Sequence, residues 1–353
     1  MQQLRNIQAK TGAKFAENTE FDVPVSFDDD AAALQAAQEE VVLCDRSHWG
    51  RIQVGDDDRL RFLHNQSTND FLQLKPGEGC DTVFITSTAR TIDLATAYVS
   101  EDAVLLIVSP NRCEFLMEWL DRYIFFADKV QLKNITDETA AFSLIGPKSN
   151  TVLEQLGASD IINQPYAHHT VVKLAGSDVR IAVGSGLALP GYTLIMPVEA
   201  AANVWNRIVQ AGVKPIGDRA WEQLRITQGR PAPETELTED YNPLEAGLWN
   251  AISFDKGCYI GQETIARLNT YKGVKQHLWG IRLDSQVEVG SIITVADEKV
   301  GKLTSCTTTE QGFLGLGYIR NKAGGLGLKV KVGNSEGEII DVPFLTHEYY
   351  EGK

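Results

Sequence analysis

The stretch Ile252-Ser253-Phe254-Asp255-Lys256-Gly257-Cys258-Tyr259-Ile260-Gly261-Gln262-Glu263-Thr264 decides how the rest of this 353-residue chain is interpreted. It places one cysteine beside a lysine, between two glycines, and just before a helix predicted from Glu263 to about Leu268. A helix N-terminus and a neighbouring ammonium both favour negative charge, so the pattern predicts that Cys258 ionises easily. The alternative is a cysteine that packs in a strand-to-helix turn, as most free cysteines do.

The run Lys-Gly-Cys-Tyr-x-Gly-Gln-Glu at 256–263 resembles the signature of the YgfZ family. That family is a branch of the folate-binding proteins that are similar to the glycine-cleavage T-protein, and it supports iron–sulfur enzymes. Three further elements are similar to the family's and follow in its order, and the resemblance covers about residue 20 to about residue 345. They are Phe-Leu-His-Asn-Gln-Ser-Thr-Asn-Asp at 62–70, Gly-Tyr-Thr-Leu-Ile-Met-Pro at 191–197, and Leu224-Arg225-Ile226 with Gly229 and Pro231.

Apolar periodicity predicts an α+β fold with a separate β-rich end. A strand–helix–strand–strand–helix order recurs between residues 83 and 211, which indicates two related units, and a helix is expected over 27–41. After Lys272, short apolar pieces alternate with glycine-rich turns, as in a small barrel. The resemblance implies two ferredoxin-like α/β units around a central folate-type cavity and a small C-terminal Greek-key β-barrel. We expect an N-terminal extension over 1–25, the folate-binding region over 26–272 and the barrel over 273–353.

Composition limits the partners. The net charge of −14 opposes broad attraction to phosphate backbones, so direct tRNA binding is not expected. Local cations between 256 and 282 either hold an anionic ligand tail or form a solvated face; they are Lys256, Arg267, Lys272, Lys275 and Arg282. No apolar run is long enough to cross a bilayer. We expect a cytoplasmic protein, with an organelle stroma or matrix as the alternative. The five cysteines have no spacing typical of a resident metal site.

A folate needs a carboxylate or amide for its pterin, a flat apolar slot for its aminobenzoate and cations for its glutamate tail. The resemblance implies that Asp93 points into the cavity; from sequence alone it is equally an outward-facing strand residue. Asn111 lies where the family has an asparagine-containing turn at the mouth of the cavity, and it resembles that turn's asparagine. Arg225 either binds a carboxylate or forms a structural ion pair with Glu222 or another acid. Further candidate folate contacts are Trp49, Tyr98, Trp249, Tyr259, Gly257, Gly261, Gln262 and Arg267.

The predicted function is a tetrahydrofolate-binding accessory protein that supports assembly or repair of iron–sulfur enzymes, including tRNA-methylthiolating ones. The Cys258 thiolate would be the reacting group, Lys256 and Asp93 would be further catalytic residues, and client or assembly proteins would be the partners. The alternatives are a folate-dependent aminomethyl or one-carbon transferase or demethylase, and a module that contacts tRNA. Glycine-cleavage T-proteins carry an acid just before the Gly-Tyr strand, where this chain has Leu-Ala-Leu-Pro at 187–190. That departure argues against full aminomethyltransferase activity.

Overall fold

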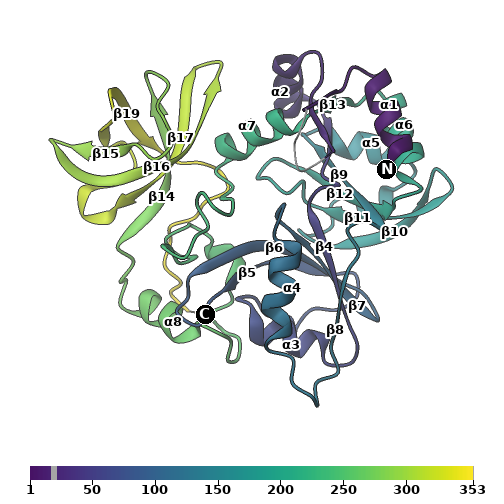
Figure 1. The fold of residues 1–353 in the computed structure, drawn as a ribbon, viewed down its shortest axis with the longest axis horizontal. Helices are drawn as coiled ribbons and strands as arrows, with labels where there is room; N and C mark the ends of the chain where they lie inside the picture. Colours follow the sequence, from purple (N-terminus) through teal and green to yellow (C-terminus); the bar gives the residue numbers. More distant parts are fainter. Residues whose placement is uncertain (17–21, 353) are drawn as a thin grey trace. The chain divides into compact units, whose positions relative to one another are not determined.

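The computed structural model describes residues 1–16 and 22–352, and it divides the chain into two compact units that are each discontinuous in sequence (Figure 1). Unit 1 consists of Met1–Arg59, Leu74–Cys80 and Thr96–Leu224. Unit 2 consists of Leu60–Gln73, Asp81–Ala95 and Arg225–Lys353. The cysteine motif, Asp93 and the C-terminal strands therefore all belong to unit 2.

The larger sheet of unit 1 has six strands in the order β10-β11-β12-β9-β3-β13, antiparallel except that β13 runs parallel to β3. Helix α6 covers it through Trp205, whose ring meets Phe142 edge-on with centroids 5.3 Å apart. The strands are β3 (Val42–Asp45), β9 (Thr139–Ile145), β10 (His169–Leu174), β11 (Ser177–Val183), β12 (Gly191–Pro197) and β13 (Lys214–Ile216). The helices of unit 1 outside the second sheet are α1 (Gln2–Lys10), α2 (Asp30–Glu39), α5 (Ser149–Gln155), η1 (Ser159–Ile161) and α6 (Ala201–Gln210).

Of the two helices near the N-terminus, one agrees with the prediction from the sequence and the other was not predicted. The helix expected over 27–41 is α2, and Asp29 caps it by accepting a hydrogen bond from the Ala32 N–H at 2.9 Å. Helix α1 lies in the predicted N-terminal extension, for which no helix is predicted from the sequence. The side chains of Arg5 and Gln8 both bind the buried Asp45 carboxylate, at 2.6 and 2.8 Å, so a tertiary contact anchors this helix. A short strand pair, β1 (Lys14–Phe15) and β2 (Pro24–Ser26), follows α1.

A second sheet has the strand order β5-β6-β7-β4-β8. Strands β5 and β6 each pass along the chain from one unit to the other, and helix α4 packs against β4 and β8 (Figure 1). The elements are β4 (Gly50–Gly55), α3 (Arg59–Gln66), β5 (Gly79–Ile85), β6 (Thr91–Val99), β7 (Ala103–Val108), α4 (Cys113–Asp121) and β8 (Gln131–Asn134). Helix α7 (Asp218–Gln228) also crosses the division between the units.

The C-terminal strands of unit 2 close into a six-stranded antiparallel barrel in the order β14-β17-β16-β15-β18-β19. Strand β14 lies beside β17 and not beside β15, which is the Greek-key arrangement. Its interior is aliphatic, with Ile281, Ile293 and Leu303 fully buried. The strands are β14 (Gln276–Leu283), β15 (Ile292–Val295), β16 (Glu298–Thr309), β17 (Gly312–Arg320), β18 (Lys329–Val332) and β19 (Ser335–Ile340), with η3 (Asn321–Ala323) after β17. The predicted α+β class with a C-terminal barrel is confirmed.

Candidate functional site

The loop that carries Cys258 is attached to the C-terminal end of helix α3. The Lys256 side chain is buried, and its ammonium donates hydrogen bonds to the backbone carbonyls of His64, Ser67 and Asn69, the last two at 2.8 and 2.7 Å. Carbonyl groups at a helix C-terminus favour a cation, so Lys256 stabilises this end of α3. Its predicted catalytic role beside the thiol stays a prediction.

The other side of the loop is held in the same place. The Ile260 N–H donates to the Asn65 carbonyl at 3.0 Å, so residues on both sides of Cys258 are bonded to the 64–69 segment. Cys258 itself is exposed, whereas Cys44 and Cys113 are buried. The alternative of a cysteine packed in the core is therefore wrong for Cys258, and its sulfur is open to reagents and partners.

Helix α8 (Gln262–Thr270) begins directly after this loop, one residue before the predicted start. Gly261 precedes it with φ of +78°, and a Cβ there would lie 2.7 Å from the Thr86 carbonyl oxygen. A left-handed backbone and so close a contact explain why glycine occupies this position. No side chain among the described residues caps this helix, so its first amide groups favour negative charge nearby.

Tyr259 points to the interior of unit 2. Its side chain is buried in the same hydrophobic cluster as Ile85 and Leu94, and burial raises the pKa of its hydroxyl. The Lys256 ammonium lies 4.6 Å from the centre of the Tyr259 ring, a cation–π distance. These contacts give Tyr259 a role in anchoring the loop; its predicted contact with folate stays a prediction.

His64 lies beside the motif, although no role is predicted for it from the sequence. Its Nδ1 lies 3.0 Å from Oδ1 of Asp70, and the side chain is only 5% exposed. Its Nε2 lies 3.4 Å from the place where a Cβ on Gly257 would be. Burial lowers the pKa of the imidazole, the Lys256 ammonium lowers it further, and the Asp70 carboxylate opposes both. The 62–70 segment that contains His64 is part of the family resemblance. The separation of His64 from Cys258 in the sequence, however, does not indicate that the two residues lie near each other.

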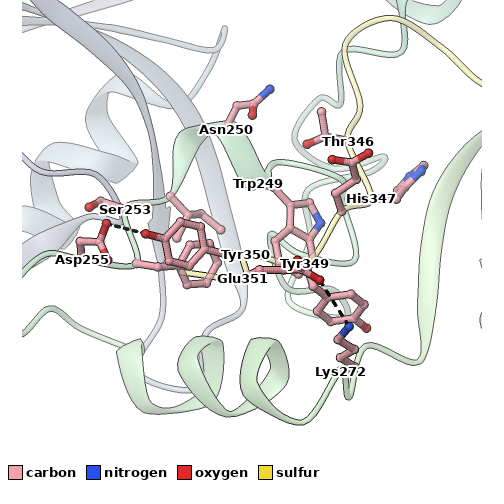
Figure 2. Close-up of a pocket in the computed structure, with 13 residues that line it drawn as sticks. Trp249, Asn250, Ser253, Asp255, Lys272, Thr346, His347, Tyr349, Tyr350 and Glu351 are labelled. Carbon is pink, nitrogen blue, oxygen red and sulfur yellow. Dashed lines mark hydrogen bonds and ion pairs between the residues drawn. The ribbon is translucent and has the colours of Figure 1, made fainter. Parts of the chain in front are cut away.

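A cavity of about 870 Å³ within unit 2 is formed by the residues just before the motif and by the C-terminal segment (Figure 2). The rings of Phe254 and Tyr350 stack with centroids 5.1 Å apart, and the Tyr350 hydroxyl donates to the Asp255 carboxylate at 2.6 Å. The Trp249 ring meets Tyr349 edge-on at 5.0 Å. Among the described residues, none accepts a hydrogen bond from the buried Trp249 indole N–H. Trp249 was one of the flat walls expected from the sequence.

Two residues predicted to bind folate are buried in unit 2. Asp93 is fully buried in β6, and its Oδ1 accepts from the Leu94 N–H at 2.9 Å, so an outward-facing Asp93 is excluded. Arg225 forms an ion pair with Glu236 at 3.0 Å, with both side chains almost completely buried. The structural ion pair that the sequence left open for Arg225 is therefore present, with Glu236 as the acid.

Trp49, Tyr98 and Asn111 belong to unit 1. Trp49 is buried, with the Arg46 guanidinium 3.7 Å above its ring. Tyr98 is buried with its ring edge-on to His169. Asn111 is exposed in the turn between β7 and α4 with φ of +61°, a conformation that asparagine tolerates better than most residues. Each has a packing or backbone role that accounts for its residue type, and their predicted contacts with folate stay predictions.

The cations predicted between 256 and 282 are not all free at the surface. Lys256 is buried, and Arg282 lies 3.3 Å from the Glu338 carboxylate. Lys272 lies 3.8 Å from the Glu351 carboxylate. Arg267 remains exposed on α8. The local positive charge is therefore smaller than the sequence suggested.

Neither a metal site nor a membrane span is found in the described part of the chain. Residues 1–16 and 22–352 contain no group of three or more histidine, cysteine, aspartate or glutamate side chains placed to hold a metal ion. No helix in these ranges combines the length and apolar character needed to cross a membrane.

Comparison with known proteins places the fold and the family. The family model described as the GCVT N-terminal domain matches residues 4–256. A chloroplastic protein of Arabidopsis thaliana named "Putative transferase" is 50% identical over 342 residues, which cover 96% of this chain and 78% of that protein. An aminomethyltransferase of Caldanaerobacter subterraneus subsp. tengcongensis is 29% identical and covers 93% of this chain and 90% of its own.

The fold has a solved counterpart in the glycine cleavage system aminomethyltransferase T from Bartonella henselae. It matches with a TM-score of 0.85 over 99% of both chains, at 18% sequence identity, which supports the fold alone. The match of the family model to most of the chain and the 50% identity over nearly its whole length concern the sequence itself. The chain therefore belongs to the GCVT-domain family, whose members are similar to the glycine-cleavage T-protein.

Proposed function

We propose that this GCVT-family chain is a tetrahydrofolate-binding accessory protein of the YgfZ type, which supports assembly or repair of iron–sulfur enzymes through Cys258. The observation that carries the proposal is the exposed thiol in a loop that is bonded on both sides to the end of α3. A fixed loop with one accessible sulfur suits a residue that meets a substrate on another protein. The substrate would be an iron–sulfur cluster or its precursor on a client or assembly protein.

Two features of unit 2 fit a reduced folate. Asp93 provides a fully buried carboxylate, the kind of group that a pterin amidine edge requires. The cavity walls provide flat aromatic rings, and the indole N–H of Trp249 offers a donor without a described acceptor. When bound, tetrahydrofolate supplies nitrogen atoms that carry one-carbon groups. In this proposal the Trp249 and Phe254 rings exclude water from the bound folate. Asp93 is not among the residues that line this cavity, so its contact with the pterin stays a prediction.

The glutamate tail of a folate would need cations other than Arg225. The Arg225 guanidinium is already neutralised by Glu236 and also donates to the Ser305 hydroxyl at 2.9 Å. Lys272, at the cavity, and Arg267, exposed on α8, are better suited to hold the tail. Replacing Lys272 with methionine is then expected to weaken binding of polyglutamylated folate more than binding of the monoglutamate, as measured by calorimetry.

The test of the thiol is genetic complementation with a matched cysteine control. In cells that lack this protein, the Cys258→Ala variant is expected to give no rescue of an iron–sulfur enzyme, read as methylthiolated tRNA by mass spectrometry. The Cys80→Ala variant removes a half-buried cysteine and is expected to rescue fully. Full rescue by Cys258→Ala, with both variants present at equal levels, would remove the thiol mechanism.

The second candidate is a folate-dependent one-carbon transferase or demethylase, and the names of the relatives favour it. Here Asp93 would position or deprotonate a nitrogen of the folate or of the amine donor. Single-turnover formation of methylenetetrahydrofolate from an amine donor, lost in Asp93→Asn and kept in Cys258→Ala, would support this candidate. Absence of product with all tested amines would support the accessory role.

The location is proposed from the same relatives. The Arabidopsis protein is chloroplastic, and its 50% identity supports the organelle alternative over the cytoplasmic expectation. A fluorescent fusion of the full-length protein in its own cells would test this proposal, with signal confined to the cytosol as the outcome that contradicts it.

A further inference from the structure

The His64 imidazole is held in one orientation beside the cysteine loop. Its Nδ1 lies 3.0 Å from Oδ1 of Asp70, and the same oxygen accepts a hydrogen bond from the Leu72 N–H at 3.0 Å. The Asp70 N–H in turn donates to the Asn69 side chain at 2.8 Å. Because a carboxylate can only accept, the neutral imidazole carries its proton on Nδ1 and presents the lone pair of Nε2.

The lone pair faces the residue before Cys258. A Cβ on Gly257 would lie 3.4 Å from Nε2, and Gly257 itself is exposed, so the glycine leaves open space between the ring and the loop. In the described part of the chain, no hydrogen bond to Nε2 is present, although the side chain is 5% exposed. This acceptor has no described partner and lies beside the loop that carries the exposed thiol, which is the position that a general base for the thiol requires.

The loop cannot easily move away from His64. Lys256 donates to the carbonyl of His64 itself, and Ile260 donates to the carbonyl of Asn65, the next residue. Cys258 is midway between these two attachments. The backbone of Cys258 is therefore held on both sides by hydrogen bonds to the segment that carries His64.

We propose that His64, oriented by Asp70, is the general base that removes the proton from Sγ of Cys258. This rests on the proposed function only in taking Cys258 as the working atom. In the step, the S–H bond breaks and its electron pair stays on sulfur, while the proton forms an Nε2–H bond. The products are a thiolate and an imidazolium. The Asp70 carboxylate stabilises the imidazolium, whereas burial and the Lys256 ammonium oppose it.

The experiment measures the rate at which iodoacetamide alkylates Cys258 in the full-length protein between pH 5.5 and 9. Mass spectrometry of each cysteine peptide separates Cys258 from the other four cysteines. His64→Gln keeps a hydrogen-bonding side chain but removes the base, and it is expected to slow alkylation at pH 7 about tenfold, because only the thiolate reacts. Asp70→Asn is expected to slow it less, in the same direction. His168→Gln, which changes a half-buried histidine of unit 1, is expected to leave the rate unchanged.

A His64→Gln profile that superimposes on that of the unchanged protein would overturn the proposal. The buried Cys44 and Cys113 report folding in the same samples, because they react only if the chain opens. If Cys44 and Cys113 become reactive in His64→Gln, the alkylation profile of Asp70→Asn is used instead. An unchanged pH profile of Cys258 alkylation in that variant overturns the proposal.

Failure here is distinct from failure of the proposed function. Unchanged alkylation in His64→Gln, combined with loss of rescue in Cys258→Ala, would reject the base and keep the accessory role. Slowed alkylation in His64→Gln, combined with full rescue by Cys258→Ala, would keep the base and reject the accessory role.

Discussion

Lys256 and Arg225 are two cations of unit 2 that the sequence placed at a ligand site, and the structure buries both in different ways. Arg225 meets a buried carboxylate, Glu236, and its charge is neutralised within the core. Lys256 donates to three backbone carbonyls at a helix end and leaves the adjacent Cys258 exposed. The Arg225–Glu236 pair stabilises the core of unit 2, whereas the hydrogen bonds of Lys256 to backbone carbonyls hold a loop whose cysteine is exposed.

The sharpest test of the comparison is to remove the anion from the first arrangement. Glu236→Gln keeps the shape of the side chain but leaves the Arg225 charge buried without its carboxylate, and it is expected to lower the free energy of unfolding by about 4 kcal/mol. Glu236 also accepts from the Ser305 hydroxyl at 2.6 Å and the Thr235 hydroxyl at 2.7 Å, so the loss extends beyond one pair. Urea denaturation followed by circular dichroism measures it.

The matched control is an ion pair on the surface. Glu338→Gln weakens the contacts of Glu338 with Arg282 at 3.3 Å and with Lys329 at 3.1 Å. Both cations are more than half exposed, so the substitution is expected to cost less than about 1 kcal/mol. Equal losses in Glu236→Gln and Glu338→Gln would mean that the Arg225 charge does not depend on its buried partner, and the distinction between the two cations would disappear.

The second test concerns the start of α8, on the other side of the cysteine loop. Gly261→Ala combines the cost of a left-handed alanine with a clash at 2.7 Å on the Thr86 carbonyl oxygen, and it is expected to cost about 3 kcal/mol. Gly327 is a matched control, because its φ of +79° is almost the same and no atom of a described residue lies within 4 Å of its added Cβ. Gly327→Ala is expected to cost about 1 kcal/mol, the backbone term alone.

The difference between the two glycine variants isolates the contact that places α8 against the 85–89 turn. Alkylation of Cys258 should change in Gly261→Ala and stay constant in Gly327→Ala, since only the first lies beside the thiol. Equal free energies of unfolding for the two variants would show that the 85–89 turn moves away from the added Cβ without loss of stability. That outcome would contradict a cysteine loop held in a fixed position.

The sequence predicted local features of the site better than its tertiary partners. The helix after Gly261, the aspartate cap of α2 and the alternating strands of the barrel follow from local patterns, and all are present. The anchoring of α1 by Asp45, the partner of Arg225 and the three carbonyls that receive Lys256 join residues up to 192 positions apart. Such contacts carry no local pattern, so a single sequence did not identify them.

His64 shows the same limit at the site itself. It stands in the quoted segment 62–70, and its six-residue spacing to Asp70 does not indicate a hydrogen bond between the two side chains. Only the folded chain brings its Nε2 beside Gly257. The aromatic cavity is similar, because Trp249 and Tyr349 are about a hundred positions apart and meet only after the C-terminal segment has packed.

The smallest expected effect tests the second cation. Lys256→Met preserves the length and apolar volume of the side chain and removes its three hydrogen bonds, so it is expected to cost about 2 kcal/mol of unfolding free energy. The cost stays below that of Glu236→Gln because this substitution removes the charge instead of leaving it buried alone. Hydrogen exchange at the Ile260 amide should quicken, since that N–H is bonded to the same end of α3.

Lys275→Met, at an exposed lysine three residues after Lys272, is the control; it should change the free energy of unfolding by less than about 0.5 kcal/mol and leave the Ile260 amide protected. A Lys256→Met variant that loses as much stability as Glu236→Gln would show that binding to backbone carbonyls holds its cation as strongly as the buried ion pair holds Arg225, and the distinction between the two cations would disappear.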